Sequence, residues 1–256
     1  MATPYALRSF EAWFIRARPW WRTNLVHNTF GPLIYLLAMG GGLGSLVGQR
    51  HPEALGGMSY GEFVAPALLV AACMQAGVAG STWPVLGALK WQRSYYAMVA
   101  TPLSVTHIYL GHLMQMTLDN AVAASGFTLV ALVLGYPTRM LLVLPIGLLT
   151  GVAFAAPIAA WSVGRRTDSE FSVLYRLGVI PMLMFSGVFF PLSSLPDALE
   201  SVLRVTPLWQ GVDLARAAVA GSLVTRAALV HFLYLVAMLV AGVLVARRTY
   251  AKALLP

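Results

Sequence analysis

Long apolar runs alternate with short polar stretches along most of the chain. A helix needs about 20 predominantly apolar residues to cross a bilayer, and six runs approach or exceed that length. They cover residues 29–48, 63–82, 106–134, 140–163, 174–190 and 227–246. The pattern predicts an all-α integral membrane protein, with six transmembrane helices in one transmembrane domain that occupies residues 1–256.

A helical repeat precedes the first apolar run, between residues 5 and 22. Its apolar side chains recur at the spacing of one helix face: Phe10, Trp13, Phe14, Ala17, Trp20 and Trp21. Arg8, Arg18 and Arg22 lie largely off this face, and Pro19 is expected to kink or end the helix. Tryptophan beside arginine is typical of an amphipathic helix in the membrane interface. Such a helix either anchors the first span or contacts a partner.

Composition agrees with a membrane protein. Of the 256 residues, 59% are hydrophobic and 10% are charged, against about 25% charged in soluble domains. The net charge of +8 does not indicate a nucleic-acid partner, because the basic residues lie mostly between apolar runs and form no basic face with interleaved aromatics. The single cysteine, Cys73, lies inside an apolar run and excludes an intramolecular disulfide.

The positions of Lys and Arg orient the predicted spans. Twelve of the 17 basic residues fall in the N-terminal segment, the second and fourth loops and the C-terminal tail, and five fall on the opposite side. Loops that stay in the cytoplasm carry the excess of Lys and Arg. Both termini are therefore predicted to be cytoplasmic, and the long loop before the last span is predicted to face outward.

The second loop, residues 83–105, is too polar to span and faces the cytoplasm in this orientation. Its apolar side chains and its basic side chains, Lys90 and Arg93, lie on different helical faces, which predicts a short amphipathic helix. It is either a solvated connector or a docking element. Docking is favoured by three aromatic side chains that are costly to leave in water: Trp91, Tyr95 and Tyr96.

The third apolar run is polar for its position. His112, Gln115 and Asp119 fall at i, i+3 and i+7, which places them on one side of a helix. A carboxylate at the centre of a spanning helix costs about 2.5–3.5 kcal/mol on insertion scales, so it must be paired, protonated or facing a polar cavity. The stripe is either part of a translocation path or coupling element, or a satisfied contact inside the helix bundle.

Residues 191–221, between the fifth and sixth runs, are too regular for an ordinary loop and too short to span. Ser194 and Asp197 have the spacing of an N-terminal cap, Pro207 separates two helical pieces, and Gly221 is suited to end the second piece. The segment is predicted to form a short re-entrant helix pair. Three aromatic residues near it are candidates to line or seal a path, or to pack against the fifth span: Phe189, Phe190 and Trp209.

Small residues at four-residue spacing occur in two of the runs: Gly40, Gly44 and Gly48 in the first, Gly147 and Gly151 in the fourth. Spacing of this kind lets helices approach closely in lipid. Close helix packing is therefore expected at both places.

Several chemical signatures are missing from the sequence. It has no GxxxxGK[ST] phosphate-binding loop, no HExxH and no GxSxG, so no catalytic site, cofactor or metal site is expected in the chain. Two other functions stay open. One is a stand-alone membrane enzyme that acts on lipid with Asp119 and His112 as an acid–base pair, and the other is a proton-coupled secondary transporter that uses Asp119.

Taken in order, several short motifs resemble the permease subunits of type 2 ATP-binding-cassette (ABC) exporters. The similarity is greatest to the branch of nodulation-factor (lipo-oligosaccharide) permeases and actinobacterial drug-export permeases. It is carried by YGEFVAP at 60–66, TPL at 101–103, GVFFPL at 187–192, PL at 207–208 and DLAR at 213–216. One departure is Ala67, where relatives often have glycine.

The resemblance implies a permease subunit that moves a drug, a lipid or a (lipo)oligosaccharide out of a bacterial cell across the cytoplasmic membrane. ATP and Mg²⁺ would bind to a separate ABC ATPase subunit, and a second permease would complete a homodimer or heterodimer in membrane lipid. The second loop would supply the coupling helix, and the outer insert would close the exit side of the path. Six residues are the candidates for contact with the ATPase: Lys90, Trp91, Arg93, Tyr95, Tyr96 and, on the N-terminal helix, Arg18.

Overall fold

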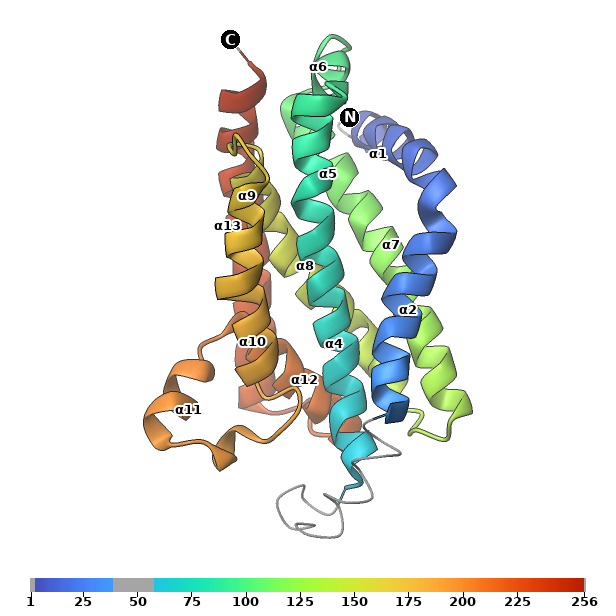
Figure 1. The fold of residues 1–256 in the computed structure, drawn as a ribbon, viewed down its shortest axis with the longest axis vertical. Helices are drawn as coiled ribbons and strands as arrows, with labels where there is room; N and C mark the ends of the chain where they lie inside the picture. Colours follow the sequence, from blue (N-terminus) through green and yellow to red (C-terminus); the bar gives the residue numbers. More distant parts are fainter. Residues whose placement is uncertain (1–2, 39–57, 256) are drawn as a thin grey trace.

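The computed structural model describes residues 3–38 and 58–255, and these residues form helices joined by short turns, with no strand among them (Figure 1). Four helical runs in this part of the chain are long and apolar enough to cross a membrane. They are Tyr60–Trp91, Val105–Val133, Met140–Ser162 and Arg226–Leu254. The predicted all-α membrane architecture is confirmed to this extent, with four candidate spans.

The other two expected crossings correspond to shorter helical runs. α2 (Trp21–Leu37) has 17 residues, and at about 1.5 Å per residue it is shorter than a hydrocarbon core of about 30 Å. The remainder of the expected span, residues 39–48 with Gly40, Gly44 and Gly48, lies outside the described residues.

The fifth expected span, residues 174–190, is displaced along the chain. Helix begins earlier, at α9 (Ser169–Leu174), and continues through the π-type turn η5 (Tyr175–Val179) into α10 (Ile180–Phe185). It ends before residue 190 because Gly187 has a φ of +77°, a conformation that glycine adopts readily and that breaks a helix. Hydropathy alone places the end too late because the residues after the break are still apolar.

α4 (Tyr60–Ser81) is the centre of the bundle and packs against α2, α7 (Val105–Val133), α8 (Met140–Ser162) and α12 (Pro207–Ala220). Apart from Glu62 and Gln75 it is almost entirely apolar, as expected of a helix that has other helices on most of its sides. A Cβ on Gly77 would lie 2.2 Å from the Gly151 carbonyl oxygen, and a Cβ on Gly147 would lie 3.1 Å from Cys73 Sγ. The close packing expected of Gly147 and Gly151 is confirmed, and α4 is the helix that approaches them.

The N-terminal segment folds as two helices with a bend between them. α1 (Thr3–Ala17) ends at the 3₁₀ turn η1 (Arg18–Trp20), and α2 continues from there. The expected kink at Pro19 is confirmed. The buried side of α1 holds Ser9 and Trp13, whereas Phe14 is 44% exposed, so only part of the expected aromatic face is turned toward the protein.

The expected loop at residues 83–105 is largely helical. The α4 helix continues through α5 (Trp83–Leu86) and the π-type turn η4 (Gly87–Trp91). Arg93, with a φ of +53°, then reverses the chain into α6 (Ser94–Val99). The prediction of one amphipathic helix with separate apolar and basic faces is wrong here, because the left-handed Arg93 divides the segment in two.

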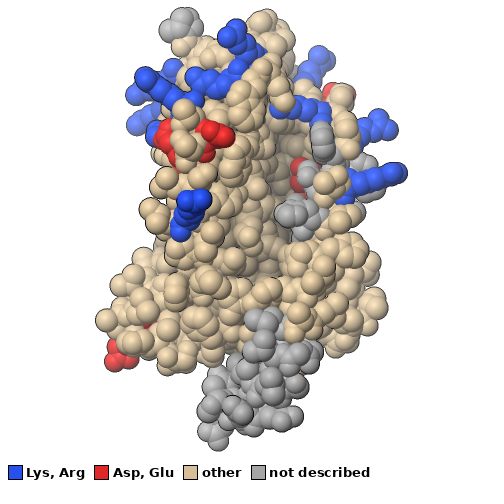
Figure 2. All heavy atoms as spheres, in the orientation of Figure 1, with Lys and Arg blue, Asp and Glu red and all other residues tan. Residues whose placement is uncertain are grey.

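Both chain ends lie at one end of the molecule, beside α1 and α6, whereas α11 and α12 lie at the other (Figure 1). We call these the basic end and the distal end. Figure 2 shows Lys and Arg side chains gathered near the basic end on the face that it displays. The last helix, α13 (Arg226–Leu254), runs between the two ends and packs against α8.

The segment from Gly187 to Gly221, here called the distal segment, contains the short turn η6 (Leu192–Ser194), α11 (Asp197–Leu203) and α12. Pro207 is the first residue of α12, and Gly221 caps it with a φ of +79°, as expected. The predicted cap at Ser194 is wrong: α11 begins at Asp197 without a side-chain cap, and Ser194 Oγ donates to the Pro191 carbonyl instead (2.7 Å).

Candidate functional site

Three helices surround a cavity of about 400 Å³ near the basic end, which we call the basic-end cavity. α7 contributes His112, Gln115 and Asp119, and the structure brings this whole polar stripe to one cavity. α1 contributes Trp13 and Arg16. The third wall is the end of the α4–η4 run.

Trp13 covers the inner wall of the basic-end cavity. Its indole stacks on the His112 imidazole, with ring centroids 3.7 Å apart and planes 4° from parallel. Arg16 lies over the same indole, with Cζ 4.9 Å from the ring centroid, and its Nη1 donates to Ser94 Oγ (3.0 Å). Partial burial lowers the pKa of the Arg16 guanidinium, but an arginine in a protein stays charged at neutral pH. This wall therefore carries a positive charge.

Two buried polar atoms on the cavity lining have no hydrogen-bond partner among the described residues: Trp13 Nε1 and Gln115 Oε1. The two residues are only 5% and 4% exposed. The Gln115 amide nitrogen donates to Asp119 Oδ1 (3.0 Å), so the amide oxygen is left without a donor. Buried polar groups are almost always hydrogen-bonded, and such a pair in one cavity indicates a place for a bound group.

The rim of the cavity is aromatic. Trp83 and Trp91, about two helical turns apart on the α4–η4 run, both line it and are 37% and 63% exposed. Gly87 makes room for this rim, because a Cβ there would lie 3.2 Å from Trp91 Cε3.

Tyr95 connects the turn at the basic end with two long helices. The side chain is fully buried, and its hydroxyl lies 3.1 Å from His112 Nδ1 on α7 and 3.4 Å from the Tyr250 hydroxyl on α13. Burial raises the pKa of Tyr95, so the phenol stays protonated and can donate. Its neighbours on the turn point outward: Lys90, Trp91, Arg93 and Tyr96 are all exposed.

Arg18, the remaining candidate at this end, is exposed on η1 between α1 and α2. We call the four exposed turn residues the turn surface. Tyr95 belongs to the packing beneath that surface and is not part of it.

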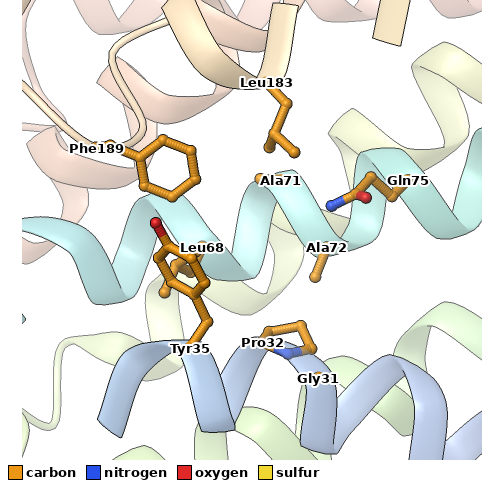
Figure 3. Close-up of a pocket in the computed structure, with 9 residues that line it drawn as sticks. All are labelled: Gly31, Pro32, Tyr35, Leu68, Ala71, Ala72, Gln75, Leu183 and Phe189. Atoms are coloured by element: carbon orange, nitrogen blue, oxygen red, sulfur yellow. The ribbon is translucent and has the colours of Figure 1, made fainter. Parts of the chain in front are cut away.

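A second cavity, of about 300 Å³, lies between α2, α4 and α10 on the distal side of the bundle; we call it the distal pocket (Figure 3). Its lining includes Tyr35, Gln75, Leu183 and Phe189. Phe189 and Tyr35 face each other with ring centroids 5.1 Å apart. The Tyr60 hydroxyl donates to the Phe189 carbonyl (3.0 Å) and so fixes the backbone that carries the ring.

The other two aromatic candidates lie apart from that pair. Phe190 is half-buried in the same turn. Trp209, on α12, packs edge-on against His231 of α13, with centroids 5.1 Å apart. The structure thus brings Phe189 to the distal pocket and Trp209 to the contact between α12 and α13.

The distal segment is held by one buried arginine. Arg216 on α12 donates from Nη2 to the carbonyls of Gly187 (2.6 Å) and Val188 (3.4 Å), and from Nε to the Phe63 carbonyl (3.4 Å). Its Cζ lies 3.7 Å from the centroid of the Phe63 ring. Burial lowers the pKa of Arg216 to about 10, which leaves it charged at neutral pH. Arg216 thus joins three parts of the chain that are far apart in sequence.

A second polar cluster joins α12 to α13. The Gln210 amide nitrogen donates to the Arg204 carbonyl (2.7 Å), which turns the amide oxygen toward His231 Nδ1 in a short contact. His231 Nε2 lies 3.0 Å from Asp213 Oδ2. Each group in this cluster has a partner.

The described residues contain no group of three or more His, Cys, Asp or Glu side chains that could hold a metal ion.

The profile of the ABC-2 type transporter family matches residues 14–220, a region that includes the basic-end cavity apart from Trp13, the turn surface and almost all of the distal segment. The chain belongs to the ABC-2 type transporter family. It is a permease subunit of an ABC transporter.

Individual relatives agree with the family. Nodulation protein J of Rhizobium meliloti (strain 1021) is 32% identical over 202 residues, which cover 78% of this chain and 75% of the relative. Nodulation protein J of Rhizobium leguminosarum bv. trifolii is 32% identical and covers 82% and 77%. The inner membrane transport permease YadH of Escherichia coli (strain K12) is 24% identical and covers 75% and 70%.

Several residues of this permease that form its cavities did not stand out in the sequence. Gln75 had a readable signal, because it is a lone amide in an apolar run. Trp13 belongs to the apolar face of the predicted amphipathic helix, but nothing in the sequence places it or Arg16 against the polar stripe of α7. Tyr35 lies in an apolar run without a local signal, and its contact with Phe189 depends on packing between segments that are distant in sequence.

Proposed function

We propose that this permease is part of an exporter, in which ATP hydrolysis on a separate ABC ATPase subunit moves a drug, a lipid or a (lipo)oligosaccharide outward. A second permease, identical or related, would complete the path, and ATP and Mg²⁺ would bind to the ATPase. The chain would lie in the bacterial cytoplasmic membrane with six crossings, counting α2 and the run from α9 to α10, and with both termini in the cytoplasm.

The position of the basic residues supports this orientation. Lys and Arg gather near the end where both termini lie (Figures 1 and 2), and cytoplasmic loops of membrane proteins carry that excess. The turn surface lies at the same end, where a cytoplasmic ATPase would reach it.

The connection through Tyr95 is the observation that carries the proposal. An ATPase that pushes on Trp91 or Tyr96 moves a turn whose buried anchor is bonded to α7 and lies beside α13. Displacement at the surface is thereby passed to two long helices. Coupling requires an element with two arrangements that a ligand can bias, and we assign that role to η4 and α6 as the coupling element, with Lys90, Trp91, Arg93 and Tyr96 as its contacts and Arg18 beside them.

The distal pocket is the candidate for the outer part of the path. Phe189 and Tyr35 approach each other across it (Figure 3), and a change in the spacing of α2, α4 and α10 would separate the rings. Phe190, in the same turn, and Trp209, on α12, would belong to the distal segment, which would be the re-entrant exit-side element. His112, Gln115 and Asp119 would line the inner part of the path.

Co-expression with the ATPase subunit tests the proposal. Tyr96→Ala combined with Arg93→Asn removes two contacts of the turn surface, while asparagine tolerates the left-handed backbone at residue 93. We expect the permease to accumulate normally, and ATPase stimulation and export to fall about tenfold or more.

Arg93→Asn with Tyr96 intact separates the loss of the guanidinium from the loss of the ring, and Arg226→Gln, an exposed residue outside this end, is the control for charge. Wild-type assembly and coupling in the double variant would contradict the assignment of the turn surface to the ATPase.

A further inference from the structure

The basic-end cavity has two chemically different walls. On the α1 side, Trp13 offers an unused N–H donor and Arg16 offers a guanidinium. On the α7 side, Gln115 offers an unused acceptor oxygen and Asp119 offers a half-buried carboxylate. The donor wall suits an anionic group, and the acceptor wall suits a cationic or N–H group.

The two charges do not neutralise each other directly. Arg16 uses Nη1 on Ser94 Oγ, and Asp119 accepts from Gln115; no ion pair joins Arg16 to Asp119 in the part of the chain that the structure describes. A purely anionic ligand would meet Asp119, and a purely cationic ligand would meet Arg16. A ligand that carries one charge of each sign matches both walls.

The aromatic rim adds to the match on the cationic side. The indoles of Trp83 and Trp91 line the same cavity, and tryptophan is the ring that attracts an ammonium group best. The rim is also partly exposed, so the site can be reached from outside the bundle.

We propose that the basic-end cavity binds the zwitterionic head group of a membrane phospholipid of the phosphoethanolamine type. The phosphate is held by Arg16 and Trp13 Nε1, and the ammonium by Asp119, Gln115 Oε1 and the indole rim. A membrane lipid is the source of this head group that best fits the position of the cavity beside α1. α1 exposes Leu7, Phe14 and Ile15 and carries Arg8, and Arg18 follows it on η1. Such a helix lies where head groups are.

Binding to this site needs neither ATP nor the ATPase, so it can be measured apart from transport, although Gln115 and Asp119 are also the proposed lining of the inner path. The bound head group would supply hydrogen-bond partners for the two unpaired atoms, Trp13 Nε1 and Gln115 Oε1. Binding also places a lipid head group against Trp13 and His112, directly beside the Tyr95 anchor of the turn.

Native mass spectrometry of the full-length chain in detergent tests the proposal. The probes are phosphatidylethanolamine, phosphatidylglycerol and a monoglucosyl diacylglycerol of the same acyl chains, together with free O-phosphoethanolamine. We expect phosphatidylethanolamine to be retained in preference. Trp13→Phe, which keeps the stacked ring, and Asp119→Asn, which keeps the shape, should each weaken its binding about tenfold, the effect of a hydrogen bond to a charged group.

Trp161→Phe, a half-buried indole of α8 outside the cavity, is the matched control and should leave binding unchanged. Gln115→Leu is a second variant that removes the orphaned oxygen if either of the others fails to fold. Preference for the glucosyl lipid, equal binding of phosphatidylglycerol, or binding of free O-phosphoethanolamine as tight as that of the lipid would each overturn the proposal. Equal losses in Trp161→Phe and Trp13→Phe would do so as well.

Discussion

The two ends of this permease treat buried polar groups in opposite ways. At the distal end, Arg216 donates to three carbonyls, and Gln210, His231 and Asp213 partner one another. At the basic end, Trp13 Nε1 and Gln115 Oε1 line a cavity without partners. A fully hydrogen-bonded network holds its side chains in one arrangement, whereas unpaired buried groups can still bond to a ligand. We therefore interpret the distal polar network as the rigid frame and the basic end as the part that binds and responds.

The distal polar network joins three of the short sequence motifs that carry the resemblance to ABC exporter permeases. The glycine of GVFFPL turns the chain with a positive φ, and the arginine of DLAR binds the carbonyl of that glycine. The first motif, YGEFVAP, joins them through the Phe63 carbonyl and ring. Three motifs that are separate in sequence thus form one structural unit.

The largest effect is expected from Arg216→Met, which keeps much of the side-chain volume but leaves buried carbonyls without donors. Each hydrogen bond to a charged group contributes about 1.5–3 kcal/mol, so we expect a loss of stability of about 3 kcal/mol or more, measured by reversible denaturation in mixed micelles. Arg226→Met, at an exposed position, is the control and should change stability by less than about 0.5 kcal/mol. Similar losses of stability in the two variants would show that the Arg216 hydrogen bonds do not stabilise the distal segment.

A smaller effect on stability, with a large effect on function, is expected from Phe189→Ala. Truncation of a half-buried aromatic ring costs about 1–2 kcal/mol, and it opens the contact with Tyr35 in the distal pocket. Export by reconstituted vesicles should fall while ATPase activity continues, so that the two become uncoupled. Leu199→Ala, on the exposed side of α11, should leave both unchanged. Normal coupled export in Phe189→Ala would make the ring a packing residue only.

Tyr95→Phe removes a single hydroxyl beneath the turn surface. It should cost about 1 kcal/mol of stability, the usual contribution of one buried hydrogen bond, and the ring itself should remain packed. If the turn transmits motion through this bond, ATPase-coupled export should decrease more than the small loss of stability explains. Tyr234→Phe, which loses a bond to the Val205 carbonyl at the distal end, is the matched control. Equal export in the two variants would show that the Tyr95 hydroxyl has no role in coupling.

Sequence patterns predicted the individual helices and turns of this fold better than the contacts between them. The glycine cap at Gly221, the kink at Pro19 and the close packing at Gly151 could be read locally, because each depends on backbone conformation or helix spacing. The helical continuation through Trp91 could not, because Lys90 and Gln92 lowered the hydropathy of a run that tertiary contacts keep helical. Ser194 does not cap α11 as expected, because its hydroxyl donates to the Pro191 carbonyl instead.

The polar stripe of α7 shows the same limit within the candidate site. Spacing placed His112, Gln115 and Asp119 on one side of a helix, and that side does face one cavity. The opposite wall, Trp13 and Arg16, comes from a helix about 100 residues away in sequence, and only the packing of α1 on α7 brings it there. The sequence left two uses of the stripe open, and the unpaired Gln115 oxygen on which our interpretation rests is visible only in three dimensions.

The most direct test compares the same substitution at the two ends: Gln210→Leu and Gln115→Leu, each purified in detergent without phosphatidylethanolamine and denatured reversibly. Gln210→Leu removes bonds on both sides of the amide and leaves the Arg204 carbonyl and His231 without their partner, so a loss of about 2–3 kcal/mol is expected. Gln115→Leu removes one bond to Asp119 but also an orphaned oxygen, so a change below about 1 kcal/mol is expected. Equal losses at the two positions, or a larger loss at Gln115, would contradict the division into a rigid distal frame and a basic end that is open to a ligand.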